Sequence, residues 1–317
     1  MDMKVVIVGG VAGGATAAAR LRRINESAEI IVFERGGYVS YANCGLPYYI
    51  GGDITDKRAL TLQTPGSFKA RFNVDVRVHS EVTAIDTAAK TVAVRETETG
   101  REYTESYDKL LLSPGAKPTV PDVPGIDNER IFTLRTVEDT FRMKDYIAAA
   151  GVKRAVIIGG GFIGLEMAEC LTEAGAAVTL LQRSEHVMPN LDFDMASFVH
   201  GYMRSKGIDL RRNTPVDHYE AIENGVRVVT RDGGSIDTDM VLLAIGVTPD
   251  TALAAKAGIK LASKGAIAVN DRMETSVKDV YAVGDAAEIV NPITGAPAVI
   301  PLAGPANKQG RIAADNI

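Results

Sequence analysis

The sequence predicts an α/β fold in which one unit occurs twice, and three observations support this. Lys4–Val8 is a short apolar run that ends in glycines, and Arg154–Ile158 is a second run of the same kind. Each run is followed by a glycine-rich turn and then by a segment of helical composition. The length of 317 residues also exceeds the ~250–300 residues at which a single core usually splits. We therefore expect two domains built around parallel sheets.

The first unit contains, in order, a strand, a turn, a helix and a strand, after which an acid stands. These are Lys4–Val8, Gly9–Gly14, Ala15–Ile24, Glu29–Phe33 and Glu34. A glycine turn at a helix N-terminus lets backbone N–H groups and the helix dipole meet a pyrophosphate. An acid about 20 residues further on is suited to the hydroxyls of a ribose. The unit is therefore predicted to be a Rossmann-like dinucleotide-binding unit, although Val11 replaces its middle glycine.

The second unit repeats this order with all three glycines of its turn in place. Its parts are the strand Arg154–Ile158, the turn Gly159–Gly164, the helix Leu165–Ala174 and the strand Val178–Leu181. The position of the ribose acid holds Gln182, and Arg183 follows it. A missing acid beside a guanidinium can accommodate a 2′-phosphate. A simply solvated Arg183 explains the pattern equally well, so both NADH and NADPH stay open.

Two breaks in the chain predict that the second domain is inserted into the first. Residues 117–125 are rich in proline, and Gly246–Pro249 forms a second candidate linker. The expected segments are 1–117 and 247–317 for the first domain and 118–246 for the second. Further strands are expected at Asp75–Val78, Val82–Ile85, Thr91–Arg95, Asp108–Leu112, Met240–Ile245, Ala266–Val269 and Val280–Val283, with a polar hairpin turn region at Glu96–Ser106.

Composition and charge restrict the class of protein. The net charge of -5 and the pI near 5.5 argue against a nucleic-acid or membrane-surface partner. No apolar run approaches the ~18 residues that span a bilayer, and no signal segment is expected at the N-terminus. Two cysteines far apart do not form a disulfide framework, and no metal site is predicted. We expect a cytoplasmic protein.

Cys44 is the candidate reactive residue. It lies in the stretch Val39–Gly52, soon after the first predicted dinucleotide unit. The other cysteine, Cys170, falls inside the predicted helix of the second unit and is expected to be a buried small hydrophobic residue. Cys44 would react as a thiolate, so positive charge or N–H donors near it are expected to lower its pKa.

The segments Gly9–Thr16 and Ser40–Pro47 together resemble those of the FAD-dependent pyridine nucleotide-disulfide oxidoreductases. The resemblance extends over essentially the whole chain and is to the coenzyme A-disulfide reductase branch, which includes NADH-dependent persulfide and polysulfide reductases. It implies that the first unit binds FAD and the second binds NAD(P)H. FAD would supply the redox chemistry, and the protein would supply position and electrostatics.

The resemblance also distinguishes the chemistry of Cys44. Dithiol members of the superfamily carry a second cysteine five residues later, where this chain has Tyr49. Single-cysteine NADH peroxidases and oxidases carry a histidine in the first glycine turn, where this chain has Ala12. Cys44 is therefore expected to cycle alone, as a mixed disulfide with a small thiol such as coenzyme A or as a sulfenic acid.

The resemblance implies contacts for two sets of residues. Residues expected to contact the cofactors are Gly9, Gly10, Val11, Ala12, Gly13, Gly14, Glu34, Arg35, Asn43, Val82, Ser113, Pro114, Gly115, Gly159, Gly161, Phe162, Ile163, Gly164, Glu166, Gln182, Arg183, Gly246, Gly284, Asp285, Pro301, Leu302 and Ala303. Residues expected to contact the substrate are Thr16, Arg20, Arg23, Ser40, Asn43, Arg71 and Asn307. Thr16, Arg20 and Arg23 share one helix face by their spacing. By composition alone that face would be a solvated surface, whereas the resemblance assigns it to the phosphates of coenzyme A.

The implied function is NAD(P)H-dependent reduction of coenzyme A disulfide, persulfides or polysulfide through FAD and Cys44. An NADH oxidase or peroxidase that uses a cysteine sulfenic acid is the first alternative, and a ferredoxin or rubredoxin reductase is the second. Full-length relatives continue into an interface domain that builds a homodimer, and some carry a rhodanese domain. The sequence ends at Ile317 without either, so the homodimer is an expectation for the full-length family and stays open for this chain.

Overall fold

The computed structural model describes residues 3–317, apart from the side chain of Leu62. The described chain divides into two compact units. Unit 1 contains residues up to 41, residues 61–117 and residues 249–317, and unit 2 contains residues 42–60 and 118–248.

Unit 1 is built on a five-stranded parallel sheet in the order β21-β9-β1-β2-β5. Its strands are β1 (Lys4–Val8), β2 (Glu29–Phe33), β5 (Asp75–Arg77), β9 (Lys109–Leu112) and β21 (Val280–Ala282). The sequence order of the strands reverses at β1, which lies between β2 and β9. In open parallel sheets ligands bind beyond the carboxyl ends of the strands at such a reversal.

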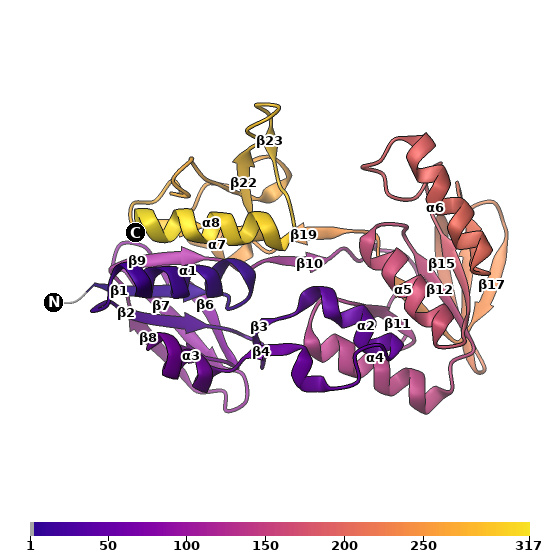
Figure 1. Ribbon diagram of the computed structural model, residues 1–317, viewed down its shortest axis with the longest axis horizontal. Helices are drawn as coiled ribbons and strands as arrows, with labels where there is room; N and C mark the ends of the chain where they lie inside the picture. Colours follow the sequence, from indigo (N-terminus) through magenta and orange to yellow (C-terminus); the bar gives the residue numbers. More distant parts are fainter. Residues whose placement is uncertain (1–2) are drawn as a thin grey trace. The chain divides into compact units, whose positions relative to one another are not determined.

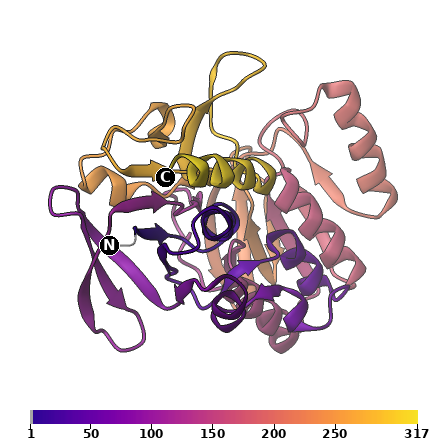
Figure 2. The same cartoon turned by 60° about the vertical axis from the view of Figure 1, so that its left-hand side comes forward.

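Two helices from opposite ends of the chain pack together in unit 1. Helix α1 (Ala12–Ile24) and helix α8 (Ala303–Asn316) lie side by side, indigo and yellow in Figures 1 and 2. A Cβ on Gly310 would lie only 2.5 Å from the carbonyl oxygen of Gly13, so the two backbones are in close contact. Helix α1 begins at Ala12 rather than at the predicted Ala15, because the last glycines of the turn are already helical.

The remaining elements of unit 1 are short. An antiparallel sheet contains β6 (Ser80–Asp86), β7 (Thr91–Glu96) and β8 (Glu102–Ser106), so half of the predicted hairpin turn region at 96–106 is strand. Smaller elements are β3 (Val39–Tyr41), β4 (Thr61–Gln63), α3 (Pro65–Phe72), α7 (Ala252–Lys256), η3 (Ser263–Gly265), β20 (Ile267–Ala268), η4 (Gly284–Ala286), β22 (Ala287–Val290) and β23 (Pro297–Ala298).

Unit 2 repeats the plan of unit 1. Its parallel sheet has the order β11-β18-β12-β13-β14, and an antiparallel sheet β15-β16-β17 accompanies it. The strands are β11 (Ile131–Thr133), β12 (Arg154–Ile158), β13 (Ala177–Leu181), β14 (Asp209–Arg211), β15 (Val216–Ile222), β16 (Gly225–Thr230), β17 (Ser235–Thr238) and β18 (Met240–Leu243). The helices are α4 (Val137–Ala150), α5 (Phe162–Glu173) and α6 (Phe193–Ser205). The duplication that the sequence predicts is therefore present.

The segment 42–60 packs with unit 2, whereas the sequence analysis assigned it to the first domain. It contains η1 (Asn43–Gly45), α2 (Leu46–Gly51) and η2 (Lys57–Ala59), and α2 packs against α4 and α5 (Figure 1). The ring of Tyr49 lies 5.6 Å from that of Phe141, and the ammonium of Lys144 lies 4.1 Å from the centre of the Tyr49 ring. These contacts join residues about 90 positions apart, which no local pattern reveals.

Two short strands, β10 (Ala116–Pro118) and β19 (Val247–Pro249), contain the points at which the chain changes unit. The last segment of unit 1 begins at residue 249, whereas the sequence predicted 247. No helix within residues 3–317 is long and apolar enough to cross a bilayer.

Candidate functional site

The first glycine turn is closed by direct backbone contact. Gly9 has φ +97°, and a Cβ there would lie 2.0 Å from the carbonyl oxygen of Ser113. A Cβ on Gly14 would lie 1.9 Å from the carbonyl oxygen of Gly9, and the Gly14 N–H donates to Ser113 Oγ at 3.1 Å. A side chain at Gly9 or Gly14 would break this closure. The turn and Ser113, far apart in the sequence, therefore form one structure.

Glu34 supports this turn with both of its oxygens. Oε2 accepts the N–H of Gly10 at 2.9 Å, and Oε1 accepts the N–H of Gly36 at 2.9 Å. Its neighbour Arg35 forms an ion pair with the buried Asp250 at 2.8 Å. Both predicted cofactor residues thus have roles in the architecture of unit 1 that the sequence analysis did not foresee.

The starts of helices α1, α5 and α8 coincide with predicted cofactor residues. Helices α1, α5 and α8 have no side-chain hydrogen bond at the N-cap and no acid in the first turn. The first N–H groups of a helix have no partner within the helix, and together with the dipole they attract anions. The predicted cofactor residues Ala12, Phe162 and Ala303 are the first residues of these helices.

The second glycine turn has the same closure as the first. Gly159 has φ +106°, and a Cβ on it would lie 2.4 Å from the carbonyl oxygen of Ala244. A Cβ on Gly164 would lie 1.9 Å from the carbonyl oxygen of Gly159. At Gly161 and at Gly246 an added Cβ would meet nothing within 4 Å, so open space adjoins these two predicted cofactor residues. Phe162, which follows Gly161, is 54% exposed.

Gln182 takes the place in unit 2 that Glu34 takes in unit 1. Its Oε1 accepts the N–H of Gly160 at 2.9 Å, as Glu34 accepts that of Gly10. Its Nε2 donates to Ser184 Oγ at 2.5 Å and to the carbonyl oxygen of His186 at 3.1 Å. Gln182 is buried, so the amide is a fixed part of the turn.

Glu166 lies one turn beyond Phe162 on α5. Desolvation by partial burial raises the pKa of its carboxyl above the usual range, and the negative charge of Glu169 adds to the shift. A carboxyl with a raised pKa can hold a proton nearer neutral pH than an exposed one.

Cys44 is exposed and lies in η1, whereas Cys170 is fully buried in α5. Burial raises the pKa of the Cys170 thiol to about 12, so it remains protonated at neutral pH. The two thiols form no disulfide. Asn43 Oδ1, on the residue next to Cys44, is buried and accepts no hydrogen bond from the described residues. A buried acceptor of this kind lacks a partner that a bound molecule can supply.

Among the predicted substrate residues, the structure brings two into contact with each other. Thr16 Oγ1 donates to Asn307 Oδ1 at 2.9 Å, so the structure brings these two together between α1 and α8. Arg20 forms an ion pair with Asp315 at 2.7 Å, and both side chains are exposed. The exposed residues Arg23 and Arg71 lie on α1 and α3, and Ser40 has φ +48° in β3.

Other predicted residues have mainly structural contacts, and some partners were missed. Val82 is buried in the second hydrophobic cluster of unit 1, so only its backbone can reach a ligand. The Gly284 N–H donates to Gln309 Oε1 at 2.6 Å. Gln309, Ser184 and Arg212 were not predicted. Arg212 directly follows β14, so the rule that ligands meet the carboxyl ends of parallel strands could have identified it.

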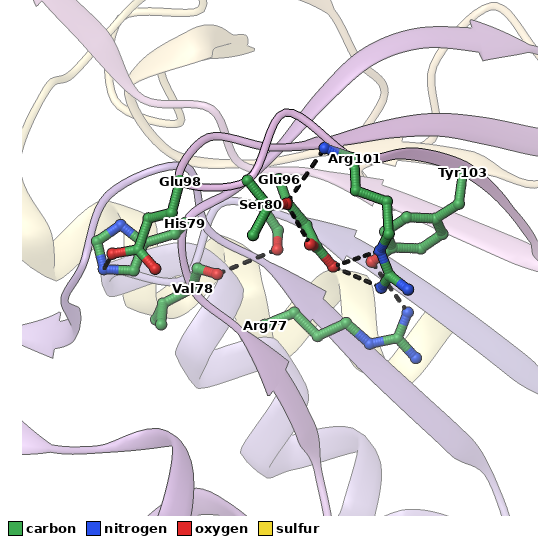
Figure 3. A pocket seen from close by; sticks show the side chains of 9 residues that line it. Arg77, Val78, His79, Ser80, Glu96, Glu98, Arg101 and Tyr103 are labelled. Atoms are coloured by element: carbon green, nitrogen blue, oxygen red, sulfur yellow. Dashed lines mark hydrogen bonds and ion pairs between the residues drawn. The ribbon is translucent and has the colours of Figure 1, made fainter.

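A cavity of about 530 Å³ in unit 1 was also not predicted. Figure 3 shows that Arg101 is directed toward Glu96, with which it forms an ion pair at 2.5 Å. Arg77 is paired with Glu105 at 2.7 Å, and His79 lies 3.6 Å from Glu98. The charged side chains that line the cavity thus face opposite charges, so the cavity offers a ligand no excess of positive or negative charge. Among residues 3–317 no cluster of side chains could hold a metal ion.

Comparison with known proteins agrees with these two glycine turns. The family model of the pyridine nucleotide-disulphide oxidoreductases matches residues 3–310. This chain belongs to that family. A coenzyme A disulfide reductase from Staphylococcus aureus strain JH9 is 38% identical over 314 residues, which cover 99% of this chain and 70% of that protein. An NADH oxidase from Methanocaldococcus jannaschii is 37% identical over 317 residues, with the same coverage.

Solved structures give the same picture. The reduced CoADR-RHD of Bacillus anthracis matches with a TM-score of 0.97 and 50% identity over 99% of this chain and 56% of that one. The NAD-dependent persulfide reductase from A. fulgidus matches with a TM-score of 0.95 and 37% identity over 99% of this chain. This chain spans little more than half of either solved chain, 59% for the second. Two further matches are the water-forming NADH oxidase from Lactobacillus brevis, bound to NADH, and an engineered NADPH oxidase variant of it, bound to NADPH. Each is 33% identical with a TM-score of 0.93, over 99% of this chain and 69% of the solved chain. Membership of the family implies FAD and NAD(P)H as cofactors.

Proposed function

We propose that this protein uses NAD(P)H and FAD to reduce coenzyme A disulfide, persulfides or polysulfide through Cys44. The observation that carries the proposal is an exposed thiol beside the unpartnered Oδ1 of Asn43, in a chain whose other thiol is buried. Relatives named as a coenzyme A disulfide reductase and a persulfide reductase support it.

Cys44 would work as a single thiol. Its thiolate attacks one sulfur of a disulfide, the S–S bond breaks, and the other sulfur leaves as a thiolate that takes a proton from water. The mixed disulfide that remains on Cys44 needs two electrons to release the second thiol. No second cysteine can form a local disulfide with Cys44, because Tyr49 occupies the place that a second thiol has in dithiol members and packs against Phe141 and Lys144.

The residues of unit 1 fit FAD. Backbone N–H groups at the starts of α1 and α8, whose N-cap residues form no side-chain hydrogen bond, would hold its phosphates, and the turn at Ser113 closes against Gly9. Glu34 stands at the end of β2, where an acid suits ribose hydroxyls. When bound, FAD would supply two-electron transfer from NAD(P)H.

One relative supports the proposal that the nicotinamide nucleotide binds in unit 2. The engineered variant of the L. brevis oxidase carries five substitutions. A glycine is replaced by alanine, and 18 residues later the run aspartate, alanine, methionine is replaced by alanine, arginine, serine. Five residues after that serine, a proline is replaced by arginine. In this chain Gly164, the run Gln182–Ser184 and Pro189 have the same spacing. Gly164 and Pro189 are also the glycine and proline of the unmodified oxidase. The adenosine half of NAD(P)H is therefore proposed to lie beyond β12 and β13.

Oxygen reduction is the second candidate, because relatives at 37% and 33% identity are named NADH oxidases. The first turn of this chain carries Ala12, which has no group that can donate or accept a proton, where the resemblance places a histidine in such enzymes. This difference favours the sulfur substrates.

The test compares wild-type protein with Cys44→Ser and with Cys170→Ala as the matched control. Each is assayed with coenzyme A disulfide, polysulfide, hydrogen peroxide and oxygen, using NADH and NADPH separately. We expect Cys44→Ser to lose at least ~10³-fold in disulfide and polysulfide reduction, because a hydroxyl cannot replace the thiolate, while Cys170→Ala keeps wild-type turnover. Wild-type turnover of these substrates by Cys44→Ser would refute the proposal, and dominant oxygen consumption would assign the chain to the oxidases.

The setting and partners are part of the same proposal. Two unpaired cysteines, one of them exposed, suit a reducing cytoplasm. The partners proposed are small thiols and disulfides, with coenzyme A phosphates near Thr16, Arg20 and Arg23 of α1. The Arg20–Asp315 ion pair is exposed, and exposed ion pairs add little to stability, so Arg20 can exchange Asp315 for a phosphate. A homodimer remains an expectation for full-length members.

A further inference from the structure

The two units carry different side chains at equivalent positions beside their glycine turns, an acid in unit 1 and an amide in unit 2. Glu34 and Gln182 each follow the second strand of their unit, and each accepts the second N–H of its own glycine turn at 2.9 Å. The difference between them is one charge. A ribose with free 2′- and 3′-hydroxyls is favoured by an acid at this position, whereas a 2′-phosphate is repelled by it.

The neutral side chain of Gln182 is held in one orientation. Its Nε2 donates to Ser184 Oγ and to the His186 carbonyl, while Oε1 faces Gly160. Because these three partners satisfy the amide and the side chain is buried, no negative charge of residue 182 faces the space beyond β13.

Cationic side chains cluster at the same edge of the sheet. Arg183 is exposed and has no ion-pair partner among the described residues. Arg212 follows β14 and donates to the carbonyl oxygen of Glu185 at 3.0 Å, and the Asn213 N–H donates to the Ser184 carbonyl at 3.1 Å. The residues after β14 therefore lie against the residues after β13, which brings a second guanidinium to the segment that carries Arg183.

The charges that oppose this cluster are few. Arg211 is paired with Asp209, and Glu185 is the one acid between residues 182 and 186. The charges of Arg212 and Arg204 contribute, after burial, to lowering the pKa of His200 in α6 below its usual value. The charges named at this end of the strands are therefore mainly positive.

We infer that unit 2 binds the 2′-phosphate of NADPH and that this protein takes NADPH in preference to NADH. Arg183 and Arg212 bind the phosphate, and Ser184 Oγ donates to it in place of its long 3.3 Å bond to the His186 carbonyl. The inference rests on the proposed function, which places the nicotinamide nucleotide in unit 2. The engineered NADPH-bound oxidase supports it, since the arginine and the serine introduced there correspond by spacing to Arg183 and Ser184.

The first measurement needs no turnover. Binding of 2′,5′-ADP and of 5′-AMP to the purified protein is compared by calorimetry, because these ligands differ only in the 2′-phosphate. We expect 2′,5′-ADP to bind at least ~10-fold more tightly, and this preference to weaken with added salt. In Arg183→Ala the preference should fall about 10-fold, since one charge-assisted contact is lost. Lys153→Ala, which removes an exposed charge at the amino end of β12, is the matched control and should leave the preference unchanged.

The second measurement is kcat/KM for each dinucleotide. Arg183→Ala should reduce kcat/KM for NADPH about 10- to 100-fold and change that for NADH by less than about twofold. Equal binding of the two nucleotides by wild-type protein, or equal losses with NADPH and NADH, would overturn the inference. If 2′,5′-ADP binds preferentially but neither dinucleotide supports reduction of any acceptor, the proposed function fails and the 2′-phosphate site stands.

Discussion

The exchange of Glu34 for glutamine tests how an acid closes the first glycine turn. The carboxylate of Glu34 accepts two backbone N–H groups, from Gly10 and Gly36, each at 2.9 Å. Glutamine has the same shape but a single acceptor oxygen, so one of these N–H groups must face an NH₂ donor. In unit 2 the amide oxygen of Gln182 faces the glycine turn. By the same preference, the oxygen of the new glutamine should remain on Gly10 and its nitrogen should face Gly36.

The magnitude follows from these two bonds. Hydrogen bonds to a charged group contribute about 1.5–3 kcal/mol, and an N–H left without a partner costs about 1–3 kcal/mol when buried. Glu34 is half-buried, so water can partly replace the lost partner. We therefore expect Glu34→Gln to lower the free energy of local opening by about 2 kcal/mol.

Hydrogen exchange of backbone amides, followed by mass spectrometry, measures this opening directly. A loss of about 2 kcal/mol corresponds to roughly 30-fold faster exchange, and we expect it in peptides that contain the Gly36 amide more than in those that contain Gly10. The reciprocal variant, Gln182→Glu, places a carboxylate oxygen against the His186 carbonyl and should accelerate exchange in unit 2. Unchanged exchange at Gly36 in Glu34→Gln would show that the carboxylate does not hold the turn.

Two further predictions concern packing and pH in unit 2. A Cβ on Gly51 would lie 2.8 Å from Cys170 Cβ, so Gly51→Ala should lower the free energy of unfolding by about 1–3 kcal/mol. Cys170→Gly should restore part of this loss in urea titrations of the double variant. Additive losses from the two substitutions would contradict the contact. His200 Nε2 accepts the Val187 N–H at 3.3 Å, and burial lowers the pKa of His200, so the folded state binds fewer protons than the unfolded state. Stability should therefore be complete above the unfolded pKa near 6.5 and fall as the pH drops through the lower folded pKa. This fall should be smaller in His200→Gln, measured as urea midpoints between pH 7.5 and 5, and an identical pH dependence in both proteins would contradict the prediction.

The sequence by itself determined the duplicated plan of the fold. The strands Lys4–Val8, Glu29–Phe33 and Arg154–Ile158 begin and end where the sequence predicts, because short apolar runs rich in β-branched residues encode buried strands locally. Both glycine turns were also predicted, and at Gly9, Gly14, Gly159 and Gly164 neighbouring backbone leaves no space for a Cβ. By the family resemblance, Tyr49 at the place of a second cysteine predicts that Cys44 works as a single thiol.

Only the tertiary structure decided which distant residues meet. Glu34 and Gln182 look like ligands for a ribose in the sequence, yet each also fastens its own glycine turn. Thr16 meets Asn307 across 291 positions, and the segment 42–60 packs with unit 2 through contacts such as Tyr49 with Phe141. Periodicity and turn propensity act over a few residues, whereas these contacts depend on how helices and strands pack. The sequence shows the single charge that separates Glu34 from Gln182 and leaves both NADH and NADPH open. Only the tertiary structure brings Arg212 to the segment that carries Arg183, which favours NADPH.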